Sequence, residues 1–376
     1  MLKLPTEPEI LRWSREGAAR MKAGALGIAD RVPVYAQMSH HAAKLAGESS
    51  IEFFTHADVF LKCELAADVF YGIDAPTIHY DVYNIESEAL GAKLVWNEKQ
   101  IPAVDSTAPL LLSLDAFESL RPIKAGKAGR MPYVLEINSR LKDMGFAPKV
   151  RFTGLFTLAA NLLGLQELIM AMMTEPDRVH KFMSFLTHDV VAPWIVCQRE
   201  HGGSKATATG SDALASPPLL STGMIREFCL KYIQELEQAV GGIRLAGLWG
   251  ESIVPDPQEL LDIKRSGSPE SIQVLDPDVT ALGPALFRRY ADGVGGSLVM
   301  GLDANLIGSG SPAEIEARTR RFIEEGGLSG RFVLFMNDIP YDTPSENVRT
   351  VVSVAHEYRA DSSNTRYVRN VTWNRR

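Results

Sequence analysis

Residues 297–323 read SLVMGLDANLIGSGSPAEIEARTRRFI and combine the two kinds of element that recur along this chain. Ser297–Leu302 is a short run of apolar and small residues, typical of a strand that is buried on both faces. A polar, glycine-containing corner follows, and Ser311-Pro-Ala-Glu is typical of a helix start with proline at the first helical position. The stretch predicts one strand–loop–helix unit of a parallel sheet.

Similar apolar runs alternate with helical patterns along the rest of the chain. Eight such units in 376 residues favour an α/β protein with a closed (β/α)8 TIM barrel over an open doubly wound sheet. The other predicted strands are Val32–Gln37, Ala75–Tyr80, Lys149–Thr153, Ala206–Thr209, Ile243–Leu248, Ile272–Leu275 and Arg331–Met336.

The predicted barrel is a single domain over residues 31–360. A helical extension is expected in residues 1–30, and a polar tail in residues 361–376. Residues 84–148 do not fit a bare barrel unit and are expected to form an elaboration after the second strand, with a small hairpin and one or two helices.

The composition is that of an ordinary globular protein, with 45% hydrophobic and 23% charged residues. The net charge of −7 disfavours a nucleic-acid partner. No window has the roughly 18 to 20 uninterrupted apolar residues of a membrane helix, and the N-terminus lacks the pattern of a signal peptide. The three cysteines are far apart in sequence, which suits reduced thiols. A cytoplasmic protein that binds no membrane is therefore expected.

Polar residues follow the predicted strands at the ends where (β/α)8 barrels carry their active sites. Asp81 stands out because a carboxylate directly after an apolar strand is costly unless it is paired. The other candidates are Gln37, His40 and His41 after the first strand, His79 and Asn84 around the second, Asp212 after the fourth, Trp249 and Glu251 after the fifth, Asp303 and Asn305 after the seventh, and Asn337 and Asp338 after the eighth.

Several of these candidates also have a local explanation. Asp212 could cap a helix that begins near Pro217 or Ser221. Asp303 with Asn305, and Asn337 with Asp338, could be turn formers. The two loop histidines could bond only to backbone, and Trp249 could belong to the core. Glu86 and Glu88 are two positions apart, so at most one of them can face the site.

Standard catalytic and phosphate-binding motifs are absent from the sequence. There is no GxGxxG after a strand, and no P-loop, HExxH, CxxC or GxSxG. The site must therefore be assembled from residues that are distant in sequence.

The order of five longer stretches resembles the uroporphyrinogen decarboxylase superfamily, which includes methylcobamide and coenzyme M methyltransferases and corrinoid-dependent demethylating methyltransferases. The resemblance covers residues 30 to 360 and implies the same barrel. The stretches are HYDVYNIESEALGA (79–92), GLFTLAANLLG (154–164), SDALASPPLLS (211–221), GLDANLIGSGSPAEIEARTRRFI (301–323) and FVLFMNDIPYDTPSENV (332–348).

The resemblance implies that the chain is not a true uroporphyrinogen decarboxylase. Those enzymes bind substrate carboxylates with an arginine-bearing segment after the first strand, whereas AQMSHHAAKLAG (36–47) has no arginine here. Asp81 matches their substrate-binding aspartate. Asn161 replaces a tyrosine, and Asn337 or Asp338 replaces a histidine.

The same comparison implies that the thiolate zinc site of the thiol methyltransferases is missing. Those members carry a histidine and a cysteine after the fifth strand, where this chain has Leu248 and Gly250. Zinc is therefore not expected. An oxygen-rich divalent site from Asp81, Asp303 and Asp338 stays open as an alternative.

The leading hypothesis is a corrinoid-dependent methyltransferase that moves a methyl group between a small O- or N-methylated substrate and a partner corrinoid protein. Candidates for the acid that protonates the leaving atom are Asp81, His40, His41 and Glu251. A decarboxylase or other lyase acting on a small acid, and a barrel without catalysis, remain as alternatives. Related barrels often form homodimers, so a homodimer is also considered. The remaining candidates, assigned to substrate binding, are Gln37, His79, Asn84, Asn161, Asp212, Trp249, Asp303, Asn305, Asn337 and Asp338.

Overall fold

The computed structural model describes residues 5–203, 205–360 and 367–369, and its chain forms two compact units. Unit 1 comprises Met1–Phe53, Val59–His79 and Pro269–Arg376. Unit 2 comprises Phe54–Asp58 and Tyr80–Ser268. The chain therefore leaves unit 1 between His79 and Tyr80, at the end of the second predicted strand, and returns after Ser268.

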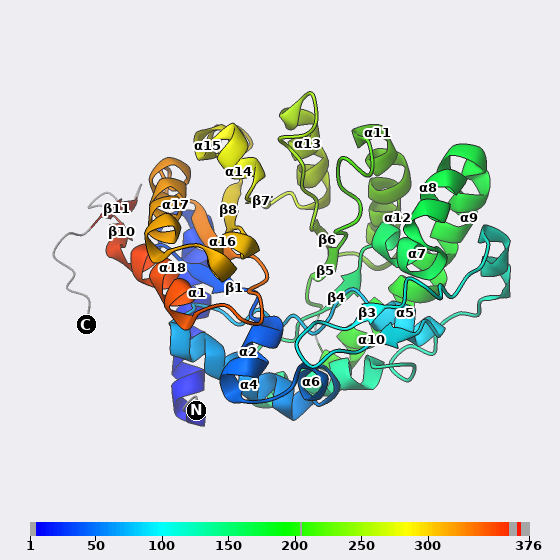
Figure 1. The fold of residues 1–376 in the computed structure, drawn as a ribbon, viewed down its shortest axis with the longest axis horizontal. Coiled ribbons are helices and arrows are strands. Elements are labelled where there is room, and N and C mark those ends of the chain that lie inside the picture. The colour runs from blue at the N-terminus through cyan, green and yellow to red at the C-terminus, as the bar shows by residue number, and fades with distance from the viewer. Residues whose placement is uncertain (1–4, 204, 361–366, 370–376) are drawn as a thin grey trace. The chain divides into compact units, whose positions relative to one another are not determined.

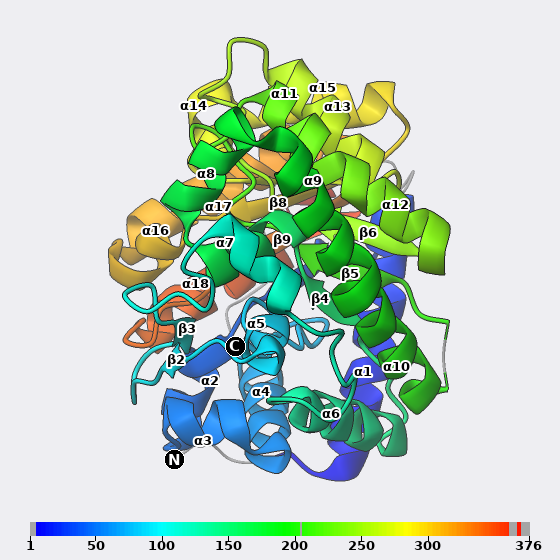
Figure 2. The ribbon, with the colours of Figure 1, turned by 90° about the vertical axis from the view of Figure 1, so that its right-hand side faces the viewer.

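Unit 1 is built on a four-stranded parallel sheet with the order β1-β9-β8-β7. Figure 1 labels β1, β7 and β8, and Figure 2 labels β9 beside β8. Both β8 and β9 are buried along their whole length, as the continuous apolar runs predict. The strands are β1 (Val34–Ala36), β7 (Ser271–Leu275), β8 (Ser297–Leu302) and β9 (Phe332–Met336), and β10 (Tyr358–Ala360) pairs antiparallel with β11 (Tyr367–Arg369). The helices wholly or mostly in this unit are α1 (Glu7–Leu26), α2 (Ser39–Ala46), α3 (Ser50–Thr55), α4 (Ala57–Tyr71), α14 (Asp278–Leu282), α15 (Pro284–Gly293), α16 (Ala304–Ser309), α17 (Pro312–Gly326) and α18 (Ser345–Glu357).

Unit 2 is built on a three-stranded parallel sheet with the order β4-β5-β6, and helices α7 to α10 and α12 lie on one side of it (Figures 1 and 2). The strands are β4 (Arg151–Thr153), β5 (Ala208–Ser211) and β6 (Ile243–Ala246), and β2 (Leu94–Val95) forms a hairpin with β3 (Ala103–Val104). The helices are α5 (Ile85–Leu90), η1 (Leu114–Ser119), α6 (Met131–Asp143), α7 (Leu155–Leu163), α8 (Leu165–Thr174), α9 (Pro176–Phe185), η2 (Leu186–Val191), α10 (Ala192–Gly202), α11 (Thr222–Ile225), η3 (Arg226–Leu230), α12 (Lys231–Val240) and α13 (Pro257–Gly267).

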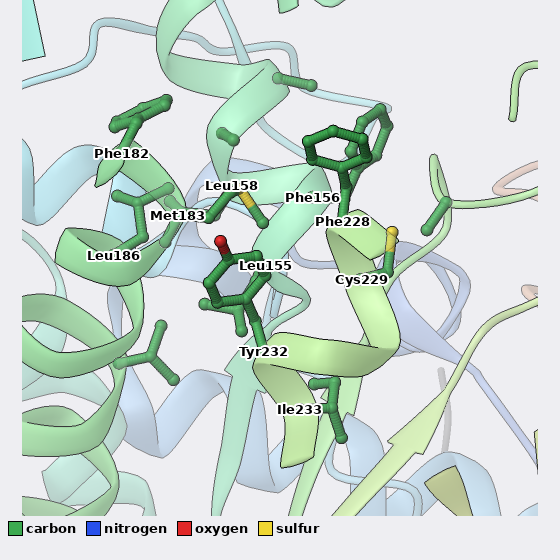
Figure 3. Close-up of a cluster of buried hydrophobic side chains, with 14 of the residues drawn as sticks. Leu155, Phe156, Leu158, Phe182, Met183, Leu186, Phe228, Cys229, Tyr232 and Ile233 are labelled. Atoms are coloured by element: carbon green, nitrogen blue, oxygen red, sulfur yellow. The ribbon is translucent and has the colours of Figure 1, made fainter. Parts of the chain in front are cut away.

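The core of unit 2 lies between these helices and the sheet. Side chains from α7, α9, η2, η3 and α12 interdigitate there (Figure 3). Burial of each such side chain contributes roughly 1.5–3 kcal/mol. This packing fixes α7. The amides of its first turn donate hydrogen bonds to Asp212, one of the candidate site residues. The labelled members are Leu155, Phe156, Leu158, Phe182, Met183, Leu186, Phe228, Cys229, Tyr232 and Ile233, all buried.

The α/β fold with parallel strands is confirmed, but the closed barrel is not seen, because the described strands pair in two separate parallel sheets. Every predicted strand has a counterpart except Ala75–Tyr80, which makes only an isolated bridge between Ala75 and Tyr35. Pro76 has no N–H to donate to a ladder, which explains why the pairing stops there. Among the described residues, the strand pairing that would close a barrel is therefore incomplete.

The predicted elaboration over residues 84–148 contains the β2–β3 hairpin and the helices α5, η1 and α6. The polar tail predicted for residues 361–376 lies outside the described residues, apart from Tyr367–Arg369. In the described part of the chain, no single helix is both long and apolar enough to cross a membrane, and α7 with α8 meets that test only as a pair bent by 107°.

Candidate functional site

Asp81 is the first candidate, and it is the second residue of the segment Tyr80–Ser268 of unit 2. Its carboxylate is completely buried. Oδ2 accepts a hydrogen bond from Arg130 Nη2 at 2.5 Å, and Oδ1 accepts one from Asn84 Nδ2 at 2.5 Å. The backbone of Asp81 has φ +53°, a left-handed conformation that aspartate tolerates better than most residues. A strained backbone under a buried, paired carboxylate is typical of functional sites.

Arg130 is the partner that sequence reasoning missed. It lies in the loop before α6 and its residue is only 8% exposed. Its Nε donates to Glu88 Oε2 at 2.7 Å, and its Nη1 donates to the Phe54 carbonyl at 3.3 Å. Its guanidinium carbon also lies 4.9 Å from the centre of the half-buried Trp96 ring. Arg130 thus joins two carboxylates, one carbonyl and one aromatic ring.

A glycine allows this loop to approach helix α5. Gly129 has φ +49°, and a Cβ added there would lie 3.0 Å from the backbone nitrogen of Ala89. Any side chain at this position would push the loop away from α5 and from Glu88, which is the residue before Ala89. Gly129 is therefore part of what brings Arg130 to its carboxylates.

Burial raises the pKa of Asp81 to about 7, even though Arg130 and Asn84 both favour the carboxylate, and Glu88 adds a further upward shift. Burial also acts to lower the pKa of Arg130, but Asp81 and Glu88 outweigh it, and the pKa is raised. Near neutral pH, Asp81 therefore exists both as an acid and as a carboxylate beside a fixed cation. That is the property required of a group that donates or accepts a proton.

Glu86 is a second buried carboxyl in the same unit. Its Oε1 accepts from the Thr153 amide at 2.9 Å, and its Oε2 accepts from Thr153 Oγ1 at 2.6 Å. Burial raises its pKa to about 7. Glu86 and Glu88 face different partners, as their spacing on α5 predicts: Glu86 bonds to β4 and Glu88 bonds to Arg130.

Asp212 caps a helix, but not the one that the sequence suggested. Its Oδ1 accepts from the Thr157 amide at 2.8 Å and its Oδ2 accepts from the Phe156 amide at 3.2 Å, both in the first turn of α7. The helix after Ser221 is capped by the Ser221 hydroxyl instead. The cap on α7 comes from a distant strand end, so no local motif could have predicted it.

Glu251 is buried and bonded to the Lys264 ammonium on α13, which is 7% exposed. Lys264 donates this hydrogen bond to Oε1 of Glu251. Trp249 is half-buried and its amide donates to Ser216 Oγ at 3.1 Å. Asn161 on α7 donates from Nδ2 to the Tyr83 carbonyl at 2.9 Å. The structure thus brings Asn84 into contact with Asp81, whereas Glu251 and Asp212 bind other partners.

The two histidines of the first predicted strand end lie in unit 1 and are buried. His40 stacks on Tyr341 with ring centres 6.0 Å apart. His41 bonds through Nε2 to the Tyr71 hydroxyl at 2.9 Å and through Nδ1 to the Tyr341 carbonyl at 3.3 Å. Burial lowers the pKa of each imidazole to about 4. Both rings are therefore neutral at pH 7.

The loops after β1 and β9 run side by side in unit 1. The Gln37 amide donates to the Met336 carbonyl at 3.0 Å, and the Ile339 amide donates to the Gln37 carbonyl at 2.9 Å. Within the described residues, Asp338 Oδ1 is shielded from solvent and has no hydrogen-bond partner, and the Asp338 backbone has φ +36°. Burial raises the pKa of Asp338 to about 6. Gln37 and Asp338 are thus neighbours along one pair of strand ends.

The remaining candidates of unit 1 are Asp303, Asn305, Asn337 and His79. Asp303 caps α16 by accepting from the Asn305 amide at 3.2 Å, which is the turn-forming alternative considered from the sequence. The Asn337 amide donates to the Leu302 carbonyl at 3.3 Å, and His79 is 5% exposed. Across the described ranges, no group of three or more histidine, cysteine, aspartate or glutamate side chains is arranged to hold a metal ion.

Comparison with known proteins agrees with the resemblance seen in the sequence. The family model described as Uroporphyrinogen decarboxylase (URO-D) matches residues 21–358. A methylated-thiol–coenzyme M methyltransferase of Methanosarcina mazei is 28% identical over 308 residues, which cover 80% of this chain and 78% of that protein. The solved structure of a methyltransferase from Methanosarcina mazei has the same fold, with a TM-score of 0.72, 20% identity, and coverage of 91% of this chain and 98% of that one. This chain belongs to the uroporphyrinogen decarboxylase family.

Proposed function

We propose that this protein is a methyltransferase that moves a methyl group between a small O- or N-methylated substrate and a partner corrinoid protein. Two observations support this choice within the family. A relative that matches over most of both chains is a methylated-thiol–coenzyme M methyltransferase. Asp81 also supplies a buried acid whose pKa lies near neutrality.

The proposal rests mainly on Asp81, a buried carboxyl group that is paired with Arg130 and has a raised pKa. When a methyl group leaves oxygen or nitrogen, the bonding electron pair stays on that atom in demethylation, and protonation makes it a better leaving group. The O–H bond of protonated Asp81 breaks and its proton goes to the leaving atom, while the electron pair stays on the carboxylate. Arg130 is already placed to stabilise the resulting charge, at 2.5 Å from Oδ2.

The corrinoid, carried by the partner protein, would supply reduced cobalt, which would accept the methyl group and donate both electrons of the new bond. The residues of this chain fit the other half of the chemistry, because the buried Asp81 can deliver a proton away from bulk water. The chain's remaining task is to orient the methyl group, which gains rate through proximity.

Decarboxylation of a porphyrinogen fits these residues less well. A substrate with several carboxylates needs free arginines, and residues 36–47 contain none. Arg130 is poorly suited to this task, because Asp81, Glu88 and the Phe54 carbonyl already take three of its five N–H donors. A lyase acting on a smaller acid is retained as an outcome of the test.

The test is to mix the protein with cob(I)alamin or a corrinoid protein and a panel of methoxylated and methylated compounds, and to follow the absorbance of methyl-Co(III). The expected result is a substrate-dependent change that Asp81→Asn reduces by at least about 100-fold. The matched control is Asp105→Asn, because the Asp105 carboxylate accepts from the amide and the hydroxyl of Thr107 in an exposed turn.

A flat trace over the whole panel, with cobalt verified in its reduced state, would contradict the proposal. Release of CO2 from a small acid, lost in Asp81→Asn, would then indicate the lyase.

A further inference from the structure

Asp81 shares one guanidinium with a second carboxylate. Arg130 donates through Nη2 to Asp81 and through Nε to Glu88, at 2.5 and 2.7 Å. The Asp81 side chain is fully buried, whereas that of Glu88 is 23% exposed. One cation cannot neutralise both carboxylates, and burial disfavours the charged form of Asp81, which is the fully buried one of the two. The excess negative charge therefore favours a proton on Asp81.

The guanidinium is also held by contacts from two further segments. Its Nη1 donates to the carbonyl of Phe54, at the end of α3, and its face packs against Trp96, which follows β2. The backbone amide of Arg130 also donates to Glu88 Oε2 at 3.3 Å. Arg130 cannot move toward one carboxylate without losing part of this set. The geometry thus keeps the cation between the two acids.

We propose that Arg130 and Glu88 are positioning residues that set the protonation of Asp81 in opposite directions. Arg130 stabilises the carboxylate left after proton donation, and Glu88 stabilises the acid that precedes it. This inference rests on the proposed role of Asp81 as proton donor. Arg130 and Glu88 are the charged groups that act on Asp81, and Asn84 adds a neutral hydrogen bond.

The two opposite signs give the test. The Cγ signal of Asp81 is followed by NMR across pH in protein labelled with [13Cγ]aspartate, and is identified by its loss in Asp81→Asn. We expect a midpoint near pH 7 in the parent. Arg130→Met should raise that midpoint by about one to three pH units, because an adjacent arginine typically lowers an aspartate pKa by that amount. Glu88→Gln should lower it by less, since Glu88 bonds to Arg130 rather than to Asp81.

Two further variants separate charge from structure. Arg130→Lys keeps the charge and should hold the midpoint closer to that of the parent than Arg130→Met does. Arg140→Met is the matched control, because Arg140 lies on α6, is exposed and pairs only with Glu136 among the described residues. It should leave the midpoint unchanged.

Shifts of the same sign in Arg130→Met and Glu88→Gln, or an unmoved midpoint in both, would overturn the inference. If circular dichroism shows that Arg130→Met does not fold, Glu88→Gln and Arg130→Lys still decide it. The titration needs neither substrate nor corrinoid, so opposite shifts without methyl transfer would refute the proposed function alone. Where transfer is seen, the pH profile of kcat should move with the midpoint.

Discussion

The strand ends of the two units differ in how their buried polar groups are stabilised. In unit 2 two buried carboxylates have a cation beside them, Asp81 with Arg130 and Glu251 with Lys264, while Glu86 and Asp212 accept hydrogen bonds from neutral groups. In unit 1 Asp276, directly after β7, is likewise paired with Arg318, whereas burial keeps His40 neutral after β1 and, in the described structure, Asp338 Oδ1 after β9 has no hydrogen-bond partner. The difference that matters is therefore between single strand ends: a fixed cation stabilises the carboxylate of Asp81, and the groups named after β1 and β9 rely on burial of the neutral form.

Lys264→Met should have the largest effect on stability, because it leaves the Glu251 carboxylate buried without its ammonium partner. Loss of one member of a buried ion pair typically costs about 3–5 kcal/mol. The free energy of unfolding, from urea denaturation, measures this. The double variant Glu251→Gln with Lys264→Met should recover much of the loss. A double variant as unstable as Lys264→Met alone would show that the pair is not the cause.

Acid should destabilise unit 1 through its neutral histidines. The pKa of His41 is about 4 in the folded protein, and its ordinary value of 6.5 applies to the unfolded chain. Between these pH values the unfolded chain therefore binds more protons than the folded protein does. The stability that this group contributes is complete above pH 6.5 and is lost as the pH falls toward 4, by up to about 3 kcal/mol. His41→Gln should flatten this part of the stability curve. An unchanged acid slope would contradict the assignment.

The opposite sign is expected for Asp81 in unit 2. Its folded pKa of about 7 exceeds the ordinary value of 3.8, so the folded protein binds more protons between these pH values. The contribution of this group to stability therefore decreases as pH rises from about 4 to 7. Asp81→Asn should remove that decrease while the acid slope from His41 persists. Urea denaturation at a series of pH values measures both slopes, and the comparison of the units fails if they share one sign.

Asp212→Ala should have the smallest effect of this series. It removes the cap from the first turn of α7, a change that typically costs about 0.5–2 kcal/mol. Ser221→Ala is the matched control, because it removes an ordinary cap from α11. Thermal unfolding of both variants measures the difference. A loss of methyl transfer in Asp212→Ala beyond its loss of folded protein would instead give Asp212 a part in binding.

The elements with a clear sequence pattern, either a continuous apolar run or a helix-start motif, were the predictable part of the fold. Continuous apolar runs located β8 and β9, and Ser311-Pro marked the start of α17 with a capping box. The run Ala75–Tyr80 looked like the others, but Pro76 leaves it with one isolated bridge. Closure of the sheet depends on pairing between distant strands, and no single run in the sequence reports that.

Asp81 could be identified from the sequence because a carboxylate after an apolar run is costly without a partner. The sequence could not identify Arg130 as its partner. Arg130 follows Arg121, Lys124 and Lys127 in one loop, and nothing in the sequence distinguishes it from them. Only the approach allowed by Gly129 brings this one cation to α5. The cap from Asp212 to α7 was hidden for the same reason, since its partners are 55 and 56 residues away.

The left-handed backbone at position 81 narrows the substitutions that evolution or a library can explore there. Alanine, the usual truncation, would remove the carboxylate and also meet a conformation that costs residues with a Cβ roughly 1–2 kcal/mol. Asparagine accepts the backbone while removing the ionisable group, and glycine accepts it while opening space beside the guanidinium. Drift away from aspartate at this position should therefore pass through asparagine or glycine first.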